Sequence, residues 1–264
     1  MDLVRREIVV ADGTTISYAC QDGAGPPVVI LHGLAGSGRE FEATARALTG
    51  RRVVLIDQRN HGHSTRHPLD TSRATFVSDA ASVIAAESAV PVDLVGQSLG
   101  AHTAMLLAAS NPLLVRRLVL LECDAGGTRP EEADALGEYF GSWPIPFADR
   151  SAAVAALGEG PLATAWIADL EERPEGLSPR FEPAVMVDAL RANATPRWPE
   201  WERVTAPTLV AYGEDGMFSE DQKAEFVRRG VHVQRVDLAH ALHDAHLDAF
   251  DQWIGALRGF LGVR

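Results

Sequence analysis

The chain has little of what marks a secreted, membrane-bound or nucleic-acid-binding protein. Its 264 residues include only two cysteines, Cys20 and Cys123, and no run of about 20 apolar residues. Lysine and arginine total 24 against 36 for aspartate and glutamate, and the net charge of −12 disfavours a phosphate backbone or an anionic membrane as partner. The opening residues, MDLVRREIVVADG, lack the apolar segment of a signal peptide. We therefore expect a reduced, cytoplasmic protein that binds neither nucleic acid nor membrane.

Strand-like apolar runs alternate with helix-like stretches along most of the chain. This alternation is typical of βαβ units, in which helices cover both faces of a mostly parallel sheet. The length suits one large α/β domain. We expect an opening hairpin that turns at Asp12-Gly13, and a final helix from about 244 to 261. The expected strands, eight in all, lie near residues 7–10, 14–20, 27–31, 53–57, 92–96, 117–122, 208–213 and 231–238.

Residues 126–196 contain no apolar run of the kind that predicts a core strand. This segment is too long for a structureless loop and contains short helix-like pieces such as 151–158 and 162–172. We therefore expect a helical cap over 126–196, inserted into a core made of residues 1–125 and 197–264. Its large apolar side chains either hold the cap together or line a pocket, and we predict substrate contacts for Trp143 and Trp166. The full set is Phe140, Trp143, Phe147, Trp166, Phe181 and Met186.

The most informative stretch is residues 92–110, where a strand-like run ends in GQSLG (96–100) and a helix-like run begins at once. A serine between a strand and a helix lies in a strained turn, where side chains on either flank would collide. The hydroxyl is then exposed above a helix N-terminus, which favours negative charge. This setting of a G-x-S-x-G motif predicts that Ser98 is a nucleophile.

A serine nucleophile needs a base, which in this chain order lies downstream of it. His240 directly follows the last expected strand, and we predict that it is the general base. His243 and His246 open an alternative, in which the three histidines form a metal site. Their spacing does not match the i, i+4 pair of a zinc-binding helix, so we expect no metal. We expect His243 and His246 to play structural roles on the first turns of the last helix.

Three motifs together resemble the α/β-hydrolase family over nearly the whole chain. They are the turn around Ser98, the LHGL segment (31–34) after the third strand, and the DQRNHGHS segment (57–64). The R-N-H-G core of the last segment looks most like small cytosolic carboxylesterases. The resemblance implies that the backbone N–H groups of Leu34 and Leu99 form an oxyanion hole, and that no cofactor is needed. It also implies structural roles for Asp57, Arg59, His61 and His63.

The acid of the triad departs from the family pattern. Relatives usually carry it as the aspartate of G-x-x-D after the seventh strand, but residues 213–216 read GEDG, which places Asp215 one position early. Glu122 ends the sixth strand-like run and resembles the strand-six glutamate of fungal zearalenone lactonases. Because glutamate reaches further than aspartate, it suits this more distant strand, and we predict Glu122 as the acid. Asp215 and Asp124 stay open as alternatives.

The predicted chemistry is acyl transfer to water through Ser98, His240 and Glu122. The aromatic cap favours a medium-sized apolar or aromatic carboxylic ester or a lactone as the small-molecule substrate. Other chemistries of this fold, such as thioester hydrolysis, C–C bond cleavage and perhydrolysis, stay open, whereas dehalogenases and epoxide hydrolases use an aspartate nucleophile. Neither the exact substrate nor the oligomeric state follows from the sequence, and a homodimer is one option.

Two alternatives belong to other functional classes. Gly33, Gly36 and Gly38 follow a strand, and Asp57 comes roughly 20 residues later, as in dinucleotide-binding oxidoreductases. The spacing is G-x-x-G-x-G instead of G-x-G-x-x-G, which disfavours this interpretation. The second alternative is a catalytically silent ligand-binding protein of hydrolase fold, because the acid is not in its usual place.

Overall fold

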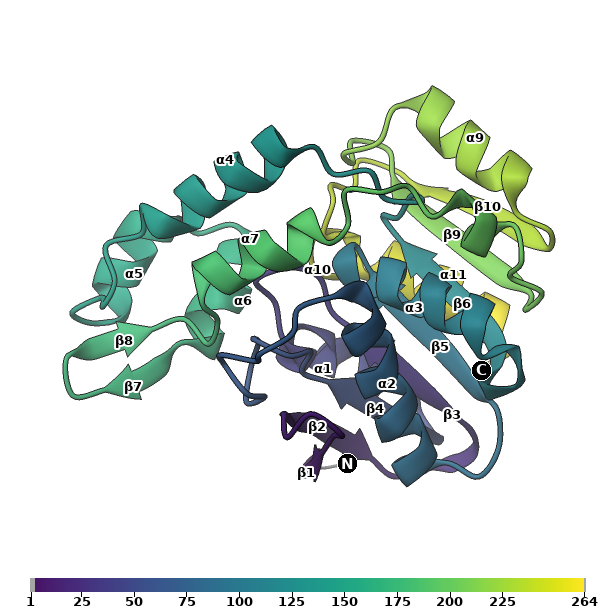
Figure 1. Cartoon of the computed structure of the whole chain (residues 1–264), viewed down its shortest axis with the longest axis horizontal. Helices are drawn as coiled ribbons and strands as arrows, with labels where there is room; N and C mark the ends of the chain where they lie inside the picture. The colour runs from purple at the N-terminus through teal and green to yellow at the C-terminus, as the bar shows by residue number, and fades with distance from the viewer. Residues whose placement is uncertain (1–2, 264) are drawn as a thin grey trace.

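The computed structural model describes residues 3–263, and within them eight strands form one sheet. Their order is β1-β2-β4-β3-β5-β6-β9-β10, with antiparallel pairing of β1 with β2 and of β2 with β4, and parallel pairing elsewhere. Figure 1 shows this sheet with helices on both faces. The predicted mostly parallel α/β architecture is thus confirmed. The strands are β1 (Val4–Val9), β2 (Thr15–Gln21), β3 (Ala24–Leu31), β4 (Arg51–Ile56), β5 (Val92–Gln97), β6 (Val115–Leu121), β9 (Thr208–Gly213) and β10 (Val233–Leu238).

The central strands are apolar at successive positions because both faces of the sheet are covered. In β3, Val29 and Leu31 belong to one buried cluster, whereas Val28 and Ile30 belong to the other. Successive side chains of a strand point to opposite faces, so each face has its own core. The first cluster contains residues of α2 (Arg73–Glu87), α3 (Leu99–Ser110) and α9 (Glu220–Arg229), and the second contains residues of α1 (Glu42–Ala47) and α11 (Phe250–Leu261).

The remaining core elements are short. The predicted final helix is divided into α10 (Ala245–Asp248) and α11, because Ala249 adopts φ −128° and ψ 41°, outside the helical region. Two 3-10 helices, η1 (Gly38–Phe41) and η2 (Pro112–Leu114), and one turn of helix, α8 (Trp198–Trp201), complete the core. Among residues 3–263, no helix is both long and apolar enough to cross a bilayer.

Residues 126–196, which we call the cap, belong to the segment between β6 and β9 and lie to one side of the sheet (Figure 1). Three of its helices begin with a proline, whose fixed φ and missing N–H suit the first helical position. The cap also contains a small hairpin that the sequence did not predict, because strands of three residues are too short to show a periodic pattern. Its elements are α4 (Pro130–Gly141), α5 (Arg150–Leu157), α6 (Pro161–Asp169), β7 (Glu171–Arg173), β8 (Gly176–Ser178) and α7 (Pro183–Arg191).

Candidate active site

Ser98 lies in a sharp turn between β5 and α3. Its φ of 51° and ψ of −119° are strained for a residue with a side chain. A Cβ on Gly96 would lie 2.4 Å from the carbonyl oxygen of Gly100, and a Cβ on Gly100 would lie 2.4 Å from that of His32. Both flanking glycines are therefore sterically required. The backbone N–H of Ser98 donates to the carbonyl of Leu121 at 2.9 Å, so the end of β6 holds this turn.

Glu122 follows β6 directly and is fully buried. Its φ of 51° turns the chain sharply at the carboxyl end of the strand. Oε1 accepts the N–H of Gly213 at 2.8 Å, and Oε2 accepts the N–H of Met217 at 3.1 Å. Oε2 also lies 3.2 Å from Nδ1 of His243. The loop after β9 and one imidazole together fix the direction of this carboxylate.

The other two candidate acids do not contact a histidine. Asp215 is exposed, and its backbone N–H donates to the carbonyl of Ala241 at 3.0 Å. Asp124 accepts the N–H of Gly126 at 2.8 Å and so stabilises a turn at the start of the cap. Of the three acids considered, Glu122 is the one that the fold brings to an imidazole.

That imidazole belongs to His243 and not to the predicted base, His240. The His240 side chain is 91% exposed, and its Nδ1 lies 3.7 Å from Oε2 of Glu214 on the surface. The prediction took the first histidine after the last strand. However, the chain turns at His240, where φ is 55°, and of these two histidines it is His243 whose side chain reaches Glu122 at the end of β6. The structure therefore moves the candidate base to His243.

His243 lies in the loop before α10, not on the last helix as expected, and its side chain is 30% exposed. The side-chain amide of Gln97, the residue before Ser98, donates to the His243 carbonyl at 3.3 Å and to Oδ1 of Asp244 at 3.2 Å. The backbone of the candidate base is thus bound to the residue that precedes Ser98. No sequence pattern distinguishes His243 from His240, because the difference depends on the path of a short loop.

The three neighbouring histidines contact three separate carboxylates and do not form a common site. His240 lies near Glu214 and His243 near Glu122. His246 is buried, stacks on Phe41 with ring centroids 4.2 Å apart, and lies 3.7 Å from Oε2 of Glu40. Within residues 3–263, no group of histidine, cysteine, aspartate and glutamate has the arrangement of a metal site.

The two predicted oxyanion donors lie on either side of Ser98. Leu99 is the first residue of α3, so its N–H has no carbonyl one turn earlier in the helix to bind. The loop that contains Leu34 passes next to the nucleophile, because a Cβ on Gly33 would lie 3.4 Å from the Cβ of Ser98. The Leu34 side chain packs against the buried cluster that contains Leu99. The residue before Leu34 and the residue after Ser98 are thus both close to the serine.

The DQRNHGHS segment is held by buried contacts. The Asp57 carboxylate accepts the N–H groups of Gly38 at 2.8 Å and His63 at 3.0 Å, and pairs with Arg5 at 2.7 Å. Although burial opposes ionisation, the hydrogen bonds from His63 and the charge of Arg5 hold the pKa of Asp57 well below its usual range. Arg59 donates two hydrogen bonds to Asp79, at 2.6 and 2.8 Å.

These contacts also disfavour the dinucleotide-binding alternative. The Asp57 carboxylate is engaged by this chain's own groups instead of being free for a ribose. The three glycines of that pattern face side chains as well: a Cβ on Gly33 would lie 2.0 Å from Gln97, and one on Gly36 would lie 2.5 Å from Glu40. A Cβ on Gly38 would lie 3.1 Å from Asp57.

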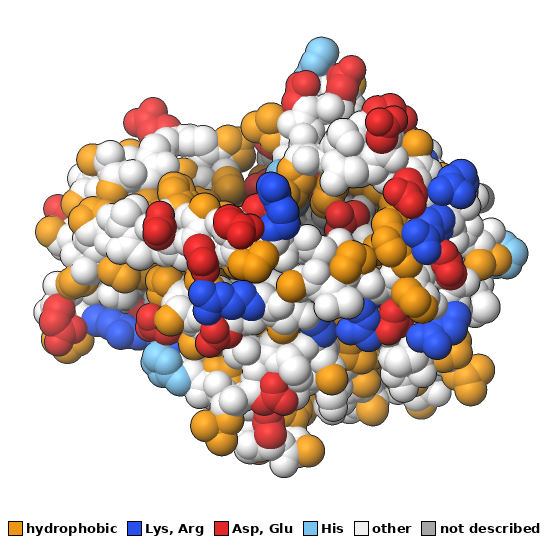
Figure 2. All heavy atoms as spheres, turned by 45° about the horizontal axis from the view of Figure 1, so that its top comes forward, with side chains coloured by type: hydrophobic (Ala, Val, Ile, Leu, Met, Phe, Trp, Pro, Cys, Tyr) orange, Lys and Arg blue, Asp and Glu red, His pale blue; other side chains and the backbone are white. Residues whose placement is uncertain are grey.

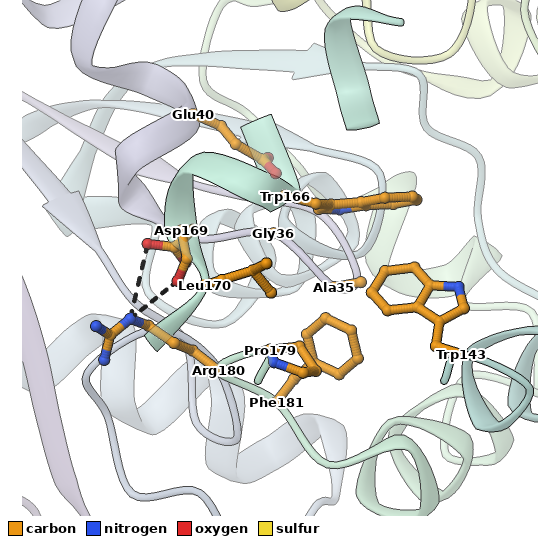
Figure 3. Close-up of a pocket in the computed structure, with 10 residues that line it drawn as sticks. All are labelled: Ala35, Gly36, Glu40, Trp143, Trp166, Asp169, Leu170, Pro179, Arg180 and Phe181. Carbon is orange, nitrogen blue, oxygen red and sulfur yellow. Dashed lines mark hydrogen bonds and ion pairs between the residues drawn. The ribbon is translucent and has the colours of Figure 1, made fainter. Parts of the chain in front are cut away.

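A narrow pocket lies between the cap and the core, beside the loop that follows Leu34. Figure 2 shows the recess between these two parts of the molecule, with hydrophobic side chains at its edge. Trp143 and Trp166, the two predicted substrate contacts, both line the pocket (Figure 3). The complete lining is Ala35, Gly36, Glu40, Trp143, Trp166, Asp169, Leu170, Pro179, Arg180 and Phe181.

The remaining large apolar residues of the cap, Phe140, Phe147 and Met186, are buried in a cluster with Trp143 and Phe181 and hold the cap together. The pocket also has a polar wall that the sequence did not predict. The Glu40 side chain is 6% exposed and points into the pocket from the core. Burial and the nearby charge of Asp169 raise the pKa of Glu40 to about 7.

A family model described as the alpha/beta hydrolase fold matches residues 26–154. The crystal structure of E-2-(acetamidomethylene)succinate hydrolase superposes with a TM-score of 0.89 and 25% identity, over 99% of this chain and 100% of that one. The chain has the α/β-hydrolase fold. The candidate residues Ser98, Glu122 and His243 follow one another in the order in which this fold places its nucleophile, acid and histidine.

Sequence relatives with this fold carry lipase and esterase names. A stretch of 120 residues is 42% identical to the sn-1-specific diacylglycerol lipase ABHD11 of Mus musculus and covers 44% of this chain and 39% of that protein. The chain thus matches about two fifths of that relative's length. Esterase Rv0045c of Mycobacterium tuberculosis is 27% identical over 270 residues, which cover 98% of this chain and 90% of that protein.

Proposed function

We propose that the protein is a serine hydrolase that cleaves carboxylic esters or lactones through Ser98, His243 and Glu122. The observation that carries this proposal is the 3.2 Å contact between Nδ1 of His243 and Oε2 of Glu122, at the strand ends that hold the Ser98 turn. The lipase and esterase names of the relatives support the reaction class. The silent binding protein is an alternative because the acid is absent from its usual position after the seventh strand. The contact supports a hydrolase instead, because Glu122 supplies a carboxylate from the end of another strand.

In this mechanism, the Ser98 hydroxyl attacks the carbonyl carbon while Nε2 of His243 accepts its proton. Glu122 accepts the hydrogen bond from Nδ1–H, which keeps the imidazole in the required tautomer and stabilises its cation. The N–H groups of Leu34 and Leu99 bind the oxyanion, and each such donor contributes about 3 kcal/mol in comparable sites. His243 then protonates the leaving alkoxide. Water attacks the acyl enzyme by the same steps and releases the acid.

The side chains that line the pocket favour a substrate with an apolar or aromatic part, and we propose one of medium size. Trp143, Trp166 and Phe181 supply large apolar surfaces beside the loop of the proposed oxyanion hole. Glu40, beside Trp166, and Asp169, across the pocket from Trp143, add polar groups (Figure 3). A substrate that is apolar along most of its length and has one polar group fits this lining best. Macrocyclic lactones and aryl or alkyl esters both meet this description.

The test is a panel of p-nitrophenyl esters of rising acyl length and one macrocyclic lactone, with wild type compared with Ser98→Ala. We expect turnover that is highest for medium chains and absent in the variant. A fluorophosphonate probe is run in parallel. If the probe labels Ser98 but no ester is cleaved, the triad works and the ester and lactone substrate class is wrong. If the probe does not label Ser98, the nucleophile assignment fails and a silent binding protein is favoured.

A further inference from the structure

Asn60 and His61 are adjacent residues that contact two different parts of the proposed site. Nε2 of His61 accepts the backbone N–H of Ala35 at 3.2 Å. Ala35 directly follows Leu34, whose own N–H is a proposed oxyanion donor. The side chain of Asn60 instead reaches the cap, at Glu182. One turn of the core therefore touches both the oxyanion loop and the cap.

The hydrogen-bonding partners of His61 determine its tautomer. Nδ1 lies 3.0 Å from the carbonyl oxygen of Arg59, which can only accept. Nδ1 must therefore carry the proton, so the lone pair of Nε2 is free to accept from Ala35. Burial lowers the pKa of His61 to about 3, which keeps the ring neutral near neutral pH. The ring also makes an edge-to-face contact with His32, with centroids 5.1 Å apart.

The hydrogen bond from the Ala35 N–H to His61 helps to hold a strained backbone in place. Ala35 has a φ of 60°, in the left-handed region that non-glycine residues avoid. The loop has one further backbone bond, from the N–H of Gly36 to the carbonyl of Gly33 at 3.4 Å, which is long. The bond to His61 fixes the peptide plane between Leu34 and Ala35. The Leu34 N–H belongs to the preceding peptide plane, whose Gly33 carbonyl lies 2.6 Å from Nδ1 of His32. The two planes meet at the Leu34 Cα, so the bond to His61 restrains the Leu34 N–H through the neighbouring plane.

Asn60 binds the backbone of Glu182 through both ends of its amide group. Nδ2 donates to the Glu182 carbonyl at 3.2 Å, and Oδ1 accepts the Glu182 N–H at 2.9 Å. The two residues are 122 positions apart in the chain. Asn60 has a φ of 69°, a conformation that asparagine tolerates better than most residues. Glu182 immediately precedes α7, so this pair of bonds fixes the start of that cap helix.

The other end of α7 packs in the same cluster as the side chains of Leu34 and Leu99, whose N–H groups are the proposed donors. Ala189 of α7 is buried in a cluster with Phe76 and Leu99, and Leu34 packs against the same cluster. A shift of α7 would therefore change the packing of both leucines. The cap and the oxyanion loop are linked twice, through the Asn60-His61 turn and through this cluster.

We propose that Asn60 and His61 are positioning residues that couple the placement of α7 to the geometry of the oxyanion hole. His61 orients the Leu34 donor through Ala35, and Asn60 ties this orientation to the cap. The inference rests on the proposed hydrolase function, because an oxyanion hole has a purpose only in such a reaction. Neither residue touches substrate. Their removal should weaken binding of the transition state more than binding of the substrate.

The first test is His61→Phe, which keeps a ring against His32 but removes the acceptor for Ala35. The exposed His67→Phe serves as the matched control. We expect kcat on an ester to fall by about 10- to 100-fold in His61→Phe with little change in KM, because one donor is misdirected but not deleted. Inhibition by a trifluoromethyl ketone, which forms an oxyanion on Ser98, should weaken by a similar factor. An unchanged kcat, or a change in KM alone, would overturn the proposal.

The second test is Asn60→Gly, which keeps the left-handed backbone but removes both bonds to Glu182. We expect kcat to fall by a smaller factor than in His61→Phe. Because both residues act on the same loop, the double variant should lose less activity than the product of the two single losses. Independent, multiplicative losses would show that the turn does not couple the cap to the hole.

A third measurement needs neither a variant nor activity. Nitrogen NMR of histidine-labelled wild type reports which ring nitrogen of His61 carries the proton. We expect the Nδ1–H tautomer and a slowly exchanging Ala35 amide proton. The Nε2–H tautomer would contradict the proposal even if the variants fail to fold. Fluorophosphonate labelling of Ser98 separates this result from a failure of the proposed function, because labelling can succeed when the His61 assignment fails.

Discussion

The Glu122 carboxylate occupies the space that a side chain at position 216 would need: a Cβ on Gly216 would lie 2.3 Å from Oε1 of Glu122. Position 216 is where the G-x-x-D pattern would carry its aspartate. The loop after β9 supplies backbone N–H groups from Gly213 and Met217 to the carboxylate instead. Gly216 has no side chain and therefore leaves the space that the Glu122 carboxylate fills.

Gly216→Ala should lower kcat by roughly 100-fold, because the added methyl group would displace the Glu122 carboxylate and a misplacement of about 1 Å costs that much. The control is Gly255→Ala in α11, where an added Cβ meets no atom within 4 Å. Ester turnover and thermal unfolding are measured for both variants. A fully active Gly216→Ala enzyme would show that the carboxylate position does not matter.

Glu122→Gln should lower kcat by about 10³- to 10⁴-fold, because a neutral amide does not stabilise the imidazolium cation as a carboxylate does. The matched variant Asp215→Asn alters an exposed residue at the usual position of the acid and should stay close to wild type. Steady-state kinetics on one p-nitrophenyl ester decide between them. If the Asp215 variant is the impaired one, the acid has been misassigned.

His243→Ala should lose activity by about 10⁵-fold or more, because removal of the base of a triad disables the nucleophile. His240→Ala should change kcat less than twofold, since its side chain is 91% exposed and faces Glu214. The fluorophosphonate labelling rate of Ser98 gives a second measure that does not depend on the substrate. Rapid labelling of the His243 variant would be incompatible with its role as base.

Glu40→Gln should make the free energy of unfolding less sensitive to pH. Burial raises the pKa of Glu40 from its usual 4.5 to about 7, so the folded state keeps a proton that the unfolded chain loses. Wild type therefore loses stability as the pH rises from 4.5 to 7, and the loss is complete above 7. Relative to wild type, the variant should gain about 3 kcal/mol between pH 4.5 and 8. Urea unfolding at both pH values measures this difference, and a constant offset would contradict it.

Trp166→Ala should raise KM for medium-chain esters by about 10-fold and leave the acetate ester nearly unchanged, because under the proposed function only a longer acyl group extends to the pocket wall that Trp166 lines. Tyr139, an exposed aromatic residue of α4, provides the control variant Tyr139→Ala. An equal effect of Trp166→Ala on short and long esters would mean that the residue supports the cap instead of contacting substrate.

The sheet and the sharp turn at Ser98 could be predicted because each has a strong local cause. Residues buried on both faces give continuous apolar runs, and the turn around Ser98 leaves room only for glycine at its flanks. Glu122 could be singled out because side chains at the carboxyl ends of parallel strands converge. The choice between His240 and His243 could not be made, since it depends on where a short loop turns. The contacts between the cap and the core, and the position of Glu40 in the pocket, depend on residues that are distant in sequence. Such contacts leave no local pattern.

The cap leaves and rejoins the core at one place. The N–H of Gly127 donates to the carbonyl of Asn193 at 2.9 Å, and the N–H of Arg197 donates to the carbonyl of Ala125 at 2.6 Å. Because its two ends are already held together, a longer, shorter or unrelated insert at this point adds little entropy cost to the folding of the sheet. Under the proposed function, the core holds the triad and the cap contacts the substrate, so we expect that the cap can be exchanged for another insert while the core is retained.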